Sequence, residues 1–240
     1  MTNAEPESCN VNLYEDLKLS EMTPFAEGDH RLCYQHPRQP ELCVKVNREG
    51  KDLALWKRAP FYKKLRSVKS FNDNWQEYLS FQQPAVAANT PGIWRHIPRC
   101  YGWVKTDMGD GLITDYYVRE NHEPAWTLAD YLSTQGADKK LSAAIAEFIA
   151  CLRKTRLITK NLLPHNILVV EDGKDVRLVL IDGFGSLSRL PLYRFKCLAG
   201  PYVEKRIKRF FVRINWELSD KAITWEEAQK RNIGDEKDFV

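Results

Sequence analysis

The chain has 240 residues, a length that suits one large domain or two small lobes and that can bury a substantial core without disulfides or metal ions. Hydrophobic residues make up 43% and charged residues 28%, and a formal charge of +4 gives no argument for a nucleic-acid partner. No apolar run is long enough to span a membrane, and the polar N-terminus has no secretory leader. We therefore expect a cytoplasmic protein, and the absence of Cys-x-x-Cys spacing among its six cysteines argues against zinc.

The start of the chain is predicted to be mostly extended. Residues 1–19 are polar and acidic and are expected to form a flexible arm or a short leading element. Residues 25–34 are predicted to pass from a turn into a strand, and the two prolines of residues 36–40 predict a turn without regular structure. Residues 42–46 alternate as a strand does. Together these segments predict a strand, a hairpin and a second strand.

Helices are predicted next. Residues 51–69 suit a helical stretch that is broken at Pro60. Residues 72–83 suit a second helix, which Asn72 or Asp73 could cap. The apolar positions predicted for this second helix are Trp75, Tyr78, Leu79 and Phe81.

The middle of the chain combines a hairpin with two further helices. Residues 97–105 and 111–118 are predicted to be strands joined by a turn at residues 108–111. Helices are predicted for residues 127–136, with Thr127 as the cap, and for residues 139–156. The buried stripe expected for the longer helix consists of Leu141, Ile145, Phe148, Ile149 and Leu152.

A last hairpin, residues 167–170 with 176–181, precedes a helical and basic remainder. Strands that come first and helices that come later predict an α+β fold rather than an alternating α/β fold. We expect an N-lobe at residues 20–118, made of an antiparallel sheet and a helix. A mainly helical C-lobe with basic helices is expected at residues 119–240.

Two segments resemble the catalytic loop and the metal loop of a protein kinase. They read Thr-Lys-Asn-Leu-Leu-Pro-His-Asn-Ile-Leu-Val at residues 159–169 and Leu-Ile-Asp-Gly-Phe-Gly at residues 180–185. A kinase places a base Asp five residues before a metal-binding Asn and holds a second metal with the Asp of Asp-Phe-Gly. The resemblance implies bound ATP and Mg²⁺, with Asn166 and Asp182 as metal ligands.

Asn161 stands where the kinase base would stand. An amide does not accept a proton at neutral pH, so Asn161 could orient a hydroxyl group but could not act as a general base. Phosphoryl transfer depends mostly on positioning and electrostatics, so the loss of the base does not exclude transfer.

Three further residues complete the candidate nucleotide site. Lys45 lies in the alternating strand and, if it faces inward, needs a negative partner such as ATP phosphates and a helix Glu. The alternative is a surface lysine on an edge strand. Glu77 is the candidate helix Glu, with a solvated carboxylate as the alternative. Gly28 is a candidate phosphate-binding turn, with an ordinary hairpin as the alternative.

Four segments together resemble the bacterial YrbL family, which is named for the PhoP regulatory network: residues 28–37, 42–46, 97–102 and 163–168. The resemblance implies a reduced protein-kinase-like fold, control by the magnesium-responsive PhoP–PhoQ system and a catalytic loop without the usual Asp. It equates the strand Lys with Lys45 and the metal-loop Asp with Asp182. Only 55 residues follow Gly185, and no Ala-Pro-Glu motif is present, which argues against a large platform for protein substrates.

The basic run at residues 205–213 has two interpretations. It could contact anionic lipid headgroups or nucleic acid. The alternative is a helix that keeps its cations in water and buries Ile207, Phe210, Phe211 and Ile214.

These observations predict a kinase-fold protein that binds ATP and Mg²⁺ and acts as a regulatory or atypical (pseudo)kinase. The alternative is an active phosphotransferase with a small-molecule, envelope-sugar or protein acceptor. A third hypothesis is an adaptor that binds a membrane surface or nucleic acid through the basic run.

Overall fold

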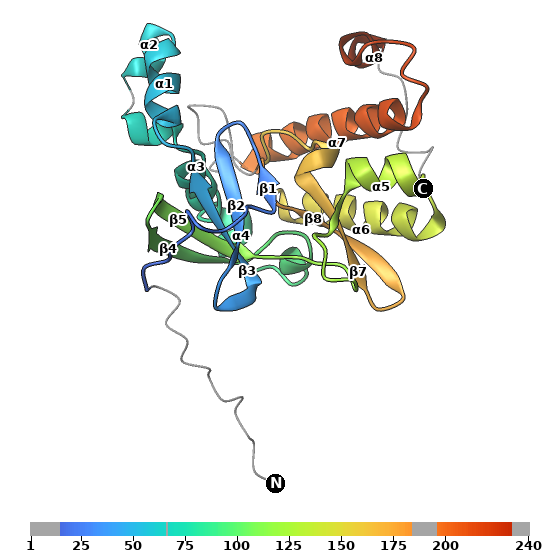
Figure 1. Cartoon of the computed structure of the whole chain (residues 1–240). Coiled ribbons are helices and arrows are strands. Elements are labelled where there is room, and N and C mark those ends of the chain that lie inside the picture. Colours follow the sequence, from blue (N-terminus) through green and yellow to red (C-terminus); the bar gives the residue numbers. More distant parts are fainter. Residues whose placement is uncertain (1–14, 66, 184–195, 232–240) are drawn as a thin grey trace.

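The computed structural model describes residues 15–65, 67–183 and 196–231, and for residues 196–198 it describes the backbone alone. Two antiparallel sheets and a set of helices make up this part of the chain (Figure 1). The expected α+β class is therefore confirmed. None of the helices in the described residues is both long and apolar enough to span a bilayer.

The first sheet has five strands in the order β1-β2-β3-β5-β4. All neighbouring strands are antiparallel. The strands are β1 (Ala26–Glu27), β2 (Arg31–His36), β3 (Gln39–Asn47), β4 (Cys100–Thr106) and β5 (Gly109–Asp115).

Both turns of this sheet differ from the predicted ones. Gln39 already pairs with His36, so β3 includes Pro40, and the turn shortens to two residues. Pro40 has no N–H to donate, but its carbonyl accepts a hydrogen bond from the Gln35 side chain at 2.9 Å. The β4–β5 turn also consists of two residues, because Thr106 pairs with Gly109. The prediction of a turn at residues 108–111 was wrong by one or two positions.

One face of the first sheet buries apolar side chains, including those of Tyr34, Val44 and Ile113. Leu17 and Leu19 pack into the same cluster and are 2% and 0% exposed. The Leu17 N–H donates to the Lys105 carbonyl at 2.9 Å. Residues 17–19 are therefore a docked leading element rather than part of a flexible arm, because two leucines provide enough apolar surface to dock them. Residues 1–14 lie outside the described residues.

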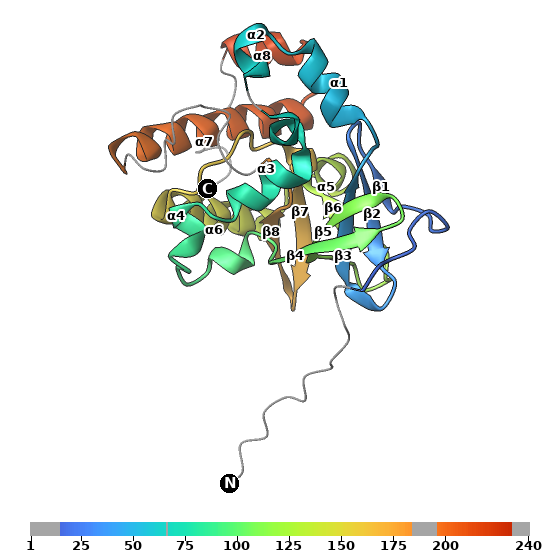
Figure 2. The ribbon, with the colours of Figure 1, turned by 90° about the vertical axis from the view of Figure 1, so that its left-hand side faces the viewer.

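Short helices connect β3 to β4. They are α1 (Lys51–Arg58), α2 (Phe61–Lys64), η1 (Val68–Phe71), α3 (Asp73–Ser80), α4 (Pro84–Ala87) and η2 (Ile93–Arg95). Figure 2 shows α1 and α2 beyond one end of the sheet, with α3 alongside it.

The buried face of α3 is polar, contrary to the prediction. Asn72 caps the helix as expected, because its side chain accepts a hydrogen bond from the Trp75 N–H at 2.9 Å. The buried residues of the helix are Asn74, Glu77 and Ser80, whereas Leu79 is 40% exposed. Polar residues can face inward here because β3 supplies charged and hydrogen-bonding partners.

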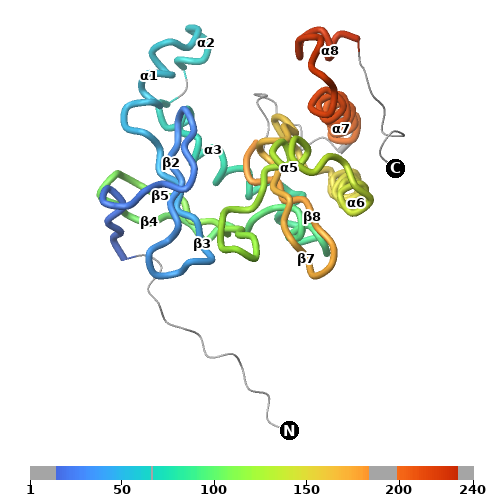
Figure 3. The backbone as a smooth tube through the Cα atoms, turned by 45° about the vertical axis from the view of Figure 1, so that its right-hand side comes forward, coloured from blue at the N-terminus to red at the C-terminus, as the bar shows by residue number. Residues whose placement is uncertain are grey.

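The second sheet has the order β6-β7-β8 and lies among the remaining helices (Figure 3). The elements are β6 (Trp126–Thr127), α5 (Leu128–Gln135), α6 (Lys139–Thr155), η3 (Pro164–Asn166), β7 (Ile167–Asp172), β8 (Asp175–Leu180), α7 (Lys196–Leu218) and α8 (Trp225–Arg231).

The predicted elements of this half are confirmed. Thr127 caps α5, and its side chain accepts a hydrogen bond from the Asp130 N–H at 3.1 Å. The five residues predicted for the buried stripe of α6 are all buried. Val86, Ile93 and Ile97, which precede the predicted lobe boundary, pack into the same core. This core therefore draws on both sides of residue 118.

The basic run lies within α7. Its apolar residues Ile207, Phe210, Phe211 and Ile214 are at most 2% exposed. The packing interpretation of this segment is thus supported, since the apolar face that would enter a membrane is already covered by protein.

Candidate functional site

A buried ion pair joins β3 to α3. Lys45 Nζ lies 2.6 Å from Glu77 Oε1, and both side chains are less than 10% exposed. Lys45 Nζ also donates to the Ile181 carbonyl at 3.0 Å. Burial alone would lower the pKa of Lys45, but Glu77 raises it above its ordinary value, so the ammonium stays charged. Lys45 therefore faces inward, and Glu77 is not a solvated carboxylate.

Arg31, from β2, connects this pair to Asp182. Its guanidinium donates to Glu77 Oε2 and lies 2.7 Å from Asp182 Oδ2. The Arg31 side chain is 10% exposed, whereas that of Asp182 is 48% exposed. Two cations and two carboxylates thus form a neutral cluster, whose inner members are buried and whose outer carboxylate reaches solvent. Sequence reasoning did not single out Arg31, although its strand alternates on the same face as Lys45.

Asp182 is held in its ionised form. Burial would raise its pKa, but Arg31 and Lys45 lower it below the ordinary value, helped by the Gly183 N–H at 2.6 Å from Oδ1. One carboxylate oxygen accepts from the backbone and the other from Arg31. Phe184 and Gly185, the rest of the predicted metal loop, lie outside the described residues.

Gly183 brings the two kinase-like segments together. Its φ is +81°, and a Cβ added to it would lie 2.8 Å from the Asn161 carbonyl oxygen and 3.6 Å from Asn166 Nδ2. The Lys160 N–H donates to the Gly183 carbonyl at 2.6 Å, and the Ile181 N–H donates to the Asn166 carbonyl at 2.9 Å. Asn166 therefore lies beside the Asp182 turn, and only glycine fits this approach without strain.

Asn161 lies beside this turn but does not line the main cavity. Its backbone contacts Gly183, and the residue lines a separate small pocket with Arg206, Arg209 and Arg213 of α7. Asn161 is not among the residues that line the main cavity. The proposed hydroxyl-orienting role of Asn161 stays a prediction.

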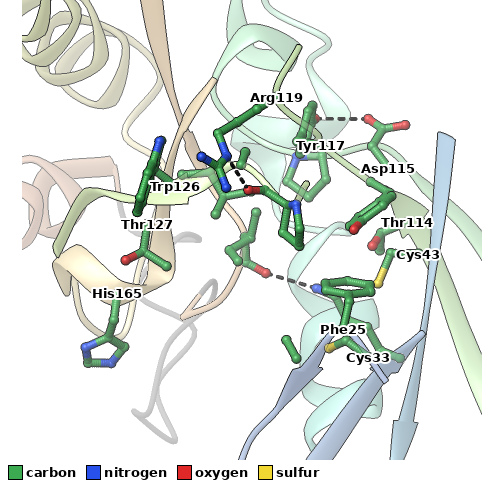
Figure 4. Close-up of a pocket in the computed structure, with 18 of the residues that line it drawn as sticks. Phe25, Cys33, Cys43, Thr114, Asp115, Tyr117, Arg119, Trp126, Thr127 and His165 are labelled. Atoms are coloured by element: carbon green, nitrogen blue, oxygen red, sulfur yellow. Dashed lines mark hydrogen bonds between the residues drawn. The ribbon is translucent and has the colours of Figure 1, made fainter. Parts of the chain in front are cut away.

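A cavity of about 440 Å³ lies between the two sheets, within the size range of small-molecule sites of about 300–1,000 Å³ (Figure 4). The first sheet contributes Cys33, Cys43, Lys45 and Thr114, and the second contributes Trp126 and Leu168. Ile181, the residue before Asp182, also lines it. The cavity thus lies next to the charged cluster.

Aromatic rings and one unpaired hydroxyl give the cavity its chemistry. Phe25 and Tyr116 lie at its wall, and their ring centroids are 4.4 Å apart. Thr114 is 1% exposed, and its Oγ1 has no hydrogen-bond partner among the described residues. A buried hydroxyl without a partner is costly, and this one is covered by the atoms of the wall rather than exposed on it.

The connection after β5 is fixed by Asp115. Its carboxylate accepts from the Arg99 N–H at 2.8 Å, from the Tyr101 hydroxyl at 2.8 Å and from the Tyr117 hydroxyl at 3.2 Å. Burial raises the pKa of Tyr117, so this hydroxyl stays protonated and able to donate. Sequence reasoning missed this anchor, whose partners lie at the start of β4 and just after β5.

Gly28 lies in the turn between β1 and β2. Its N–H donates to the Arg31 carbonyl at 2.8 Å, and its carbonyl accepts from Arg48 Nε at 3.0 Å. These are the bonds of an ordinary hairpin, so the Gly28 N–H is already used within the turn. A role in phosphate binding stays a prediction.

The donor set near Asp182 suits a hard cation. Mg²⁺ prefers oxygen ligands and is commonly held by one or two protein side chains together with phosphates and water. Asp182 and Asn166 offer a carboxylate and an amide oxygen beside the same turn. Within the described residues, no group of three or more His, Cys, Asp or Glu side chains could hold a metal ion by itself.

Comparisons with known proteins identify the family. The model of the family described as PhoP regulatory network protein YrbL matches residues 17–218. The chain is 26% identical over 184 residues to the uncharacterized protein YrbL of Escherichia coli strain K12, an alignment that covers 73% of this chain and 77% of that protein. The uncharacterized protein YrbL of Shigella flexneri matches with the same identity and coverage. With a family model that spans most of its length, this chain belongs to the YrbL family of PhoP regulatory network proteins.

Proposed function

We propose that this protein binds ATP with Mg²⁺ between two protein-kinase-like lobes and acts as a regulatory, atypical (pseudo)kinase in a PhoP–PhoQ-type stress response. The observation that carries the proposal is the buried Lys45–Glu77 pair, whose lysine also contacts the residue before Asp182. A strand lysine, a helix glutamate and a metal-loop aspartate are the parts with which a kinase holds phosphates and metal.

Each part of the site has a role in this proposal. The Lys45 ammonium contacts phosphate oxygens while Glu77 keeps it in place. Asp182 and Asn166 are the candidate ligands for Mg²⁺, which neutralises phosphate charge when bound. The apolar cavity receives the base. These roles follow from side-chain chemistry and from the proximity of the groups.

The regulatory interpretation rests on Asn161. An asparagine side chain does not accept a proton from a substrate hydroxyl at neutral pH. Nucleotide binding without efficient transfer would let the protein act through its conformation or through a docked partner.

The alternative is an active phosphotransferase on a small-molecule, envelope-sugar or protein acceptor. It is favoured by the adjacency of Asn166 and Asp182 and by the exposure of the Asp182 carboxylate, which leaves room for a phosphate-bound cation. Positioning and charge supply most of the rate in this chemistry, so transfer without a base is feasible.

Nucleotide binding is tested by thermal unfolding with ATP, with and without Mg²⁺. A ligand that binds only the folded state at 100 times its dissociation constant adds about 2.7 kcal/mol to the unfolding free energy. We expect Mg-ATP to stabilise the wild type. Asp182→Asn should lose the Mg²⁺-dependent part of this effect, and Lys45→Met should weaken the whole effect.

Matched controls come from an exposed ion pair at the β4–β5 turn. Lys105 and Asp110 lie 2.6 Å apart and are 72% and 58% exposed. Lys105→Met and Asp110→Asn should respond to Mg-ATP as the wild type does. Absence of any shift with ATP, whether or not Mg²⁺ is present, would contradict nucleotide binding.

Incubation with γ-labelled ATP separates the two functions. The regulatory proposal predicts no label on the protein or on cell-envelope extracts above the level of Asp182→Asn. Label that appears with the wild type and disappears with this variant would instead support the phosphotransferase.

A further inference from the structure

Two cysteines lie side by side in the wall of the cavity. Cys33 is in β2 and Cys43 is in β3, and both line the cavity (Figure 4). The strand register pairs Cys33 with Lys45 and Gln35 with Cys43. The two thiols are therefore diagonal neighbours on one face of the sheet, the face that carries the charged cluster.

The surroundings of Cys33 favour a thiolate. The Cys43 side chain hydrogen bonds to it, Lys45 and Arg31 add positive charge, and burial and Glu77 oppose these effects. Together they lower the pKa of Cys33 to about 7. The pKa of Cys43 is raised by the same hydrogen bond and by burial. At neutral pH, the Cys43 thiol therefore stays protonated and donates a hydrogen bond to the Cys33 sulfur.

The other titratable groups that line the cavity are Asp115, Tyr116, Tyr117, Asp130 and His165, with Arg119 as a further cation. The Asp115 carboxylate accepts hydrogen bonds from the three donors described above. Burial raises the pKa of both tyrosines, so neither adds negative charge near pH 7. The Cys33 thiolate thus has Lys45 and Arg31 as its nearest cations.

The remaining described thiols lack this activation. Burial raises the pKa of Cys100 to about 11 and also raises that of Cys151. Cys33 and Cys151 are both partly exposed. Cys151 therefore serves as an internal reference, a thiol with similar access whose pKa burial raises although Lys154 acts in the opposite direction.

We propose that Cys33 is a modification site, a nucleophilic thiol that forms a mixed disulfide with small-molecule disulfides that enter the cavity. The Cys33 thiolate attacks one sulfur of the incoming disulfide, so that a new S–S bond forms and the old one breaks. The departing sulfur leaves with the bonding electron pair as a thiolate and takes a proton from water. Cys33 is thereby oxidised and half of the incoming molecule is reduced, and an added thiol reverses the step.

The modification would have a direct consequence at the site. A group attached to Cys33 occupies the cavity beside Lys45, where the base and phosphates of a nucleotide are proposed to lie. This consequence rests on the proposed nucleotide binding, whereas the reactivity of the thiol does not.

The first test is the pH dependence of alkylation by iodoacetamide, followed for each cysteine by mass spectrometry. Trypsin separates Cys33, Cys43, Cys100 and Cys151 onto different peptides, because a Lys or Arg lies between each pair. We expect the Cys33 rate to rise with a midpoint near pH 7. The midpoint of Cys151 should lie at higher pH.

The expected difference in rate at pH 7 is moderate. A thiol with a pKa near 7 is about half ionised, while one with a pKa above 9 is at most ~1% ionised, but the weaker base is also the weaker nucleophile by about tenfold. Cys33 should therefore react about fivefold faster than Cys151 at pH 7. A Cys33 midpoint no lower than that of Cys151 would overturn the proposal.

Variants of Cys43 test the hydrogen bond. Cys43→Ala removes the donor and should shift the Cys33 midpoint to higher pH, while Cys43→Ser keeps a donor and should shift it less. Cys151→Ala should leave the midpoint unchanged. If Cys43→Ala does not fold by circular dichroism, the serine variant and the wild-type profile still decide the question.

The disulfide chemistry itself is tested with bis(2-hydroxyethyl) disulfide, a small neutral probe. We expect one adduct on the Cys33 peptide that dithiothreitol removes and that Cys33→Ser abolishes. Mg-ATP should slow its formation. Failure of Cys33 to form the adduct counts against the thiol proposal, whereas normal adduct formation without protection by Mg-ATP counts against nucleotide in this cavity and leaves the thiol chemistry standing.

Discussion

At the scale of single residues, the cluster of Arg31, Lys45, Glu77 and Asp182 dominates the site. Each buried carboxylate or cation has an opposite charge within hydrogen-bonding distance, which is the condition under which buried ions are tolerated. Arg31 is the member that joins both carboxylates, because its planar fork can donate in two directions at once. A lysine at this position could not hold the same geometry.

Replacement of Arg31 tests this role. Arg31→Gln leaves Glu77 with one cation and removes the charge next to Asp182, so we expect the free energy of unfolding to fall by about 1–3 kcal/mol. The matched control is Arg48→Gln on the same hairpin, whose partner Glu27 is 59% exposed and whose loss should cost less than about 1 kcal/mol. Denaturant unfolding near pH 7 measures both. Equal effects of the two substitutions would mean that the buried cluster contributes no more than a surface pair.

At the scale of elements, α3 carries Glu77 to the site. The helix has eight residues and depends on its cap and on tertiary contacts, because a helix this short is not stable alone. Its buried Asn74 donates to the Lys45 carbonyl at 2.6 Å, which ties the helix to β3 one turn before Glu77. Polar contacts thus orient the element that positions the carboxylate.

The cap of α3 gives a prediction for this element. Asn72→Ala removes the bond to the Trp75 N–H and should lower the free energy of unfolding by about 1 kcal/mol. Asn72→Ser retains a capping oxygen and should cost clearly less. Urea unfolding of the wild type and both variants provides the comparison, and indistinguishable losses for Ala and Ser would show that the cap is not what holds the helix.

At the scale of the whole molecule, a few buried polar side chains join the segment between β3 and β4 to the helical half. Gln83 accepts from the Ile158 N–H at 2.8 Å and donates to the Ile158 carbonyl at 3.4 Å. His96 is 2% exposed, its Nδ1 lies 2.9 Å from the Leu178 carbonyl oxygen, and its ring lies 5.6 Å from that of Phe148. The His96 contact ties β8, which leads to Ile181 and Asp182, to the segment that leads into β4.

His96 makes this junction dependent on pH. Burial lowers its pKa below 6.5, although the Leu178 carbonyl and Glu147 act in the opposite direction. The unfolded chain therefore binds a proton at higher pH than the folded protein does, so the contribution of His96 is complete above about pH 6.5 and is lost as the pH falls through the lowered pKa.

The measurement is the difference in unfolding free energy between wild type and His96→Gln as a function of pH. This difference should shrink as the pH falls from about 7.5 to about 5.5. His165→Gln serves as the control for replacing a histidine at an exposed position. A wild-type advantage over His96→Gln that is independent of pH would exclude this role of His96.

The sequence by itself determined the features that depend on neighbouring residues. The buried stripe of α6 follows from its 3.6-residue period, and the caps of α3 and α5 follow from single polar side chains ahead of each helix. Lys45, Glu77, Asn166 and Asp182 could be proposed because their motifs are local. The family could also be recognised from short segments.

Tertiary structure alone decided which distant residues meet. Lys45 contacts the Ile181 carbonyl, although the two residues are 136 positions apart in the sequence. Arg31 contacts both Glu77 and Asp182, and these three residues lie on three separate segments of the chain. The polar face of α3 contradicts its apolar pattern because partners on β3 compensate for its burial. Docking of Leu17 and Leu19 depends on a surface that only the folded sheet presents. Periodicity describes one element at a time, whereas the stability of a buried charge depends on what the rest of the chain brings next to it.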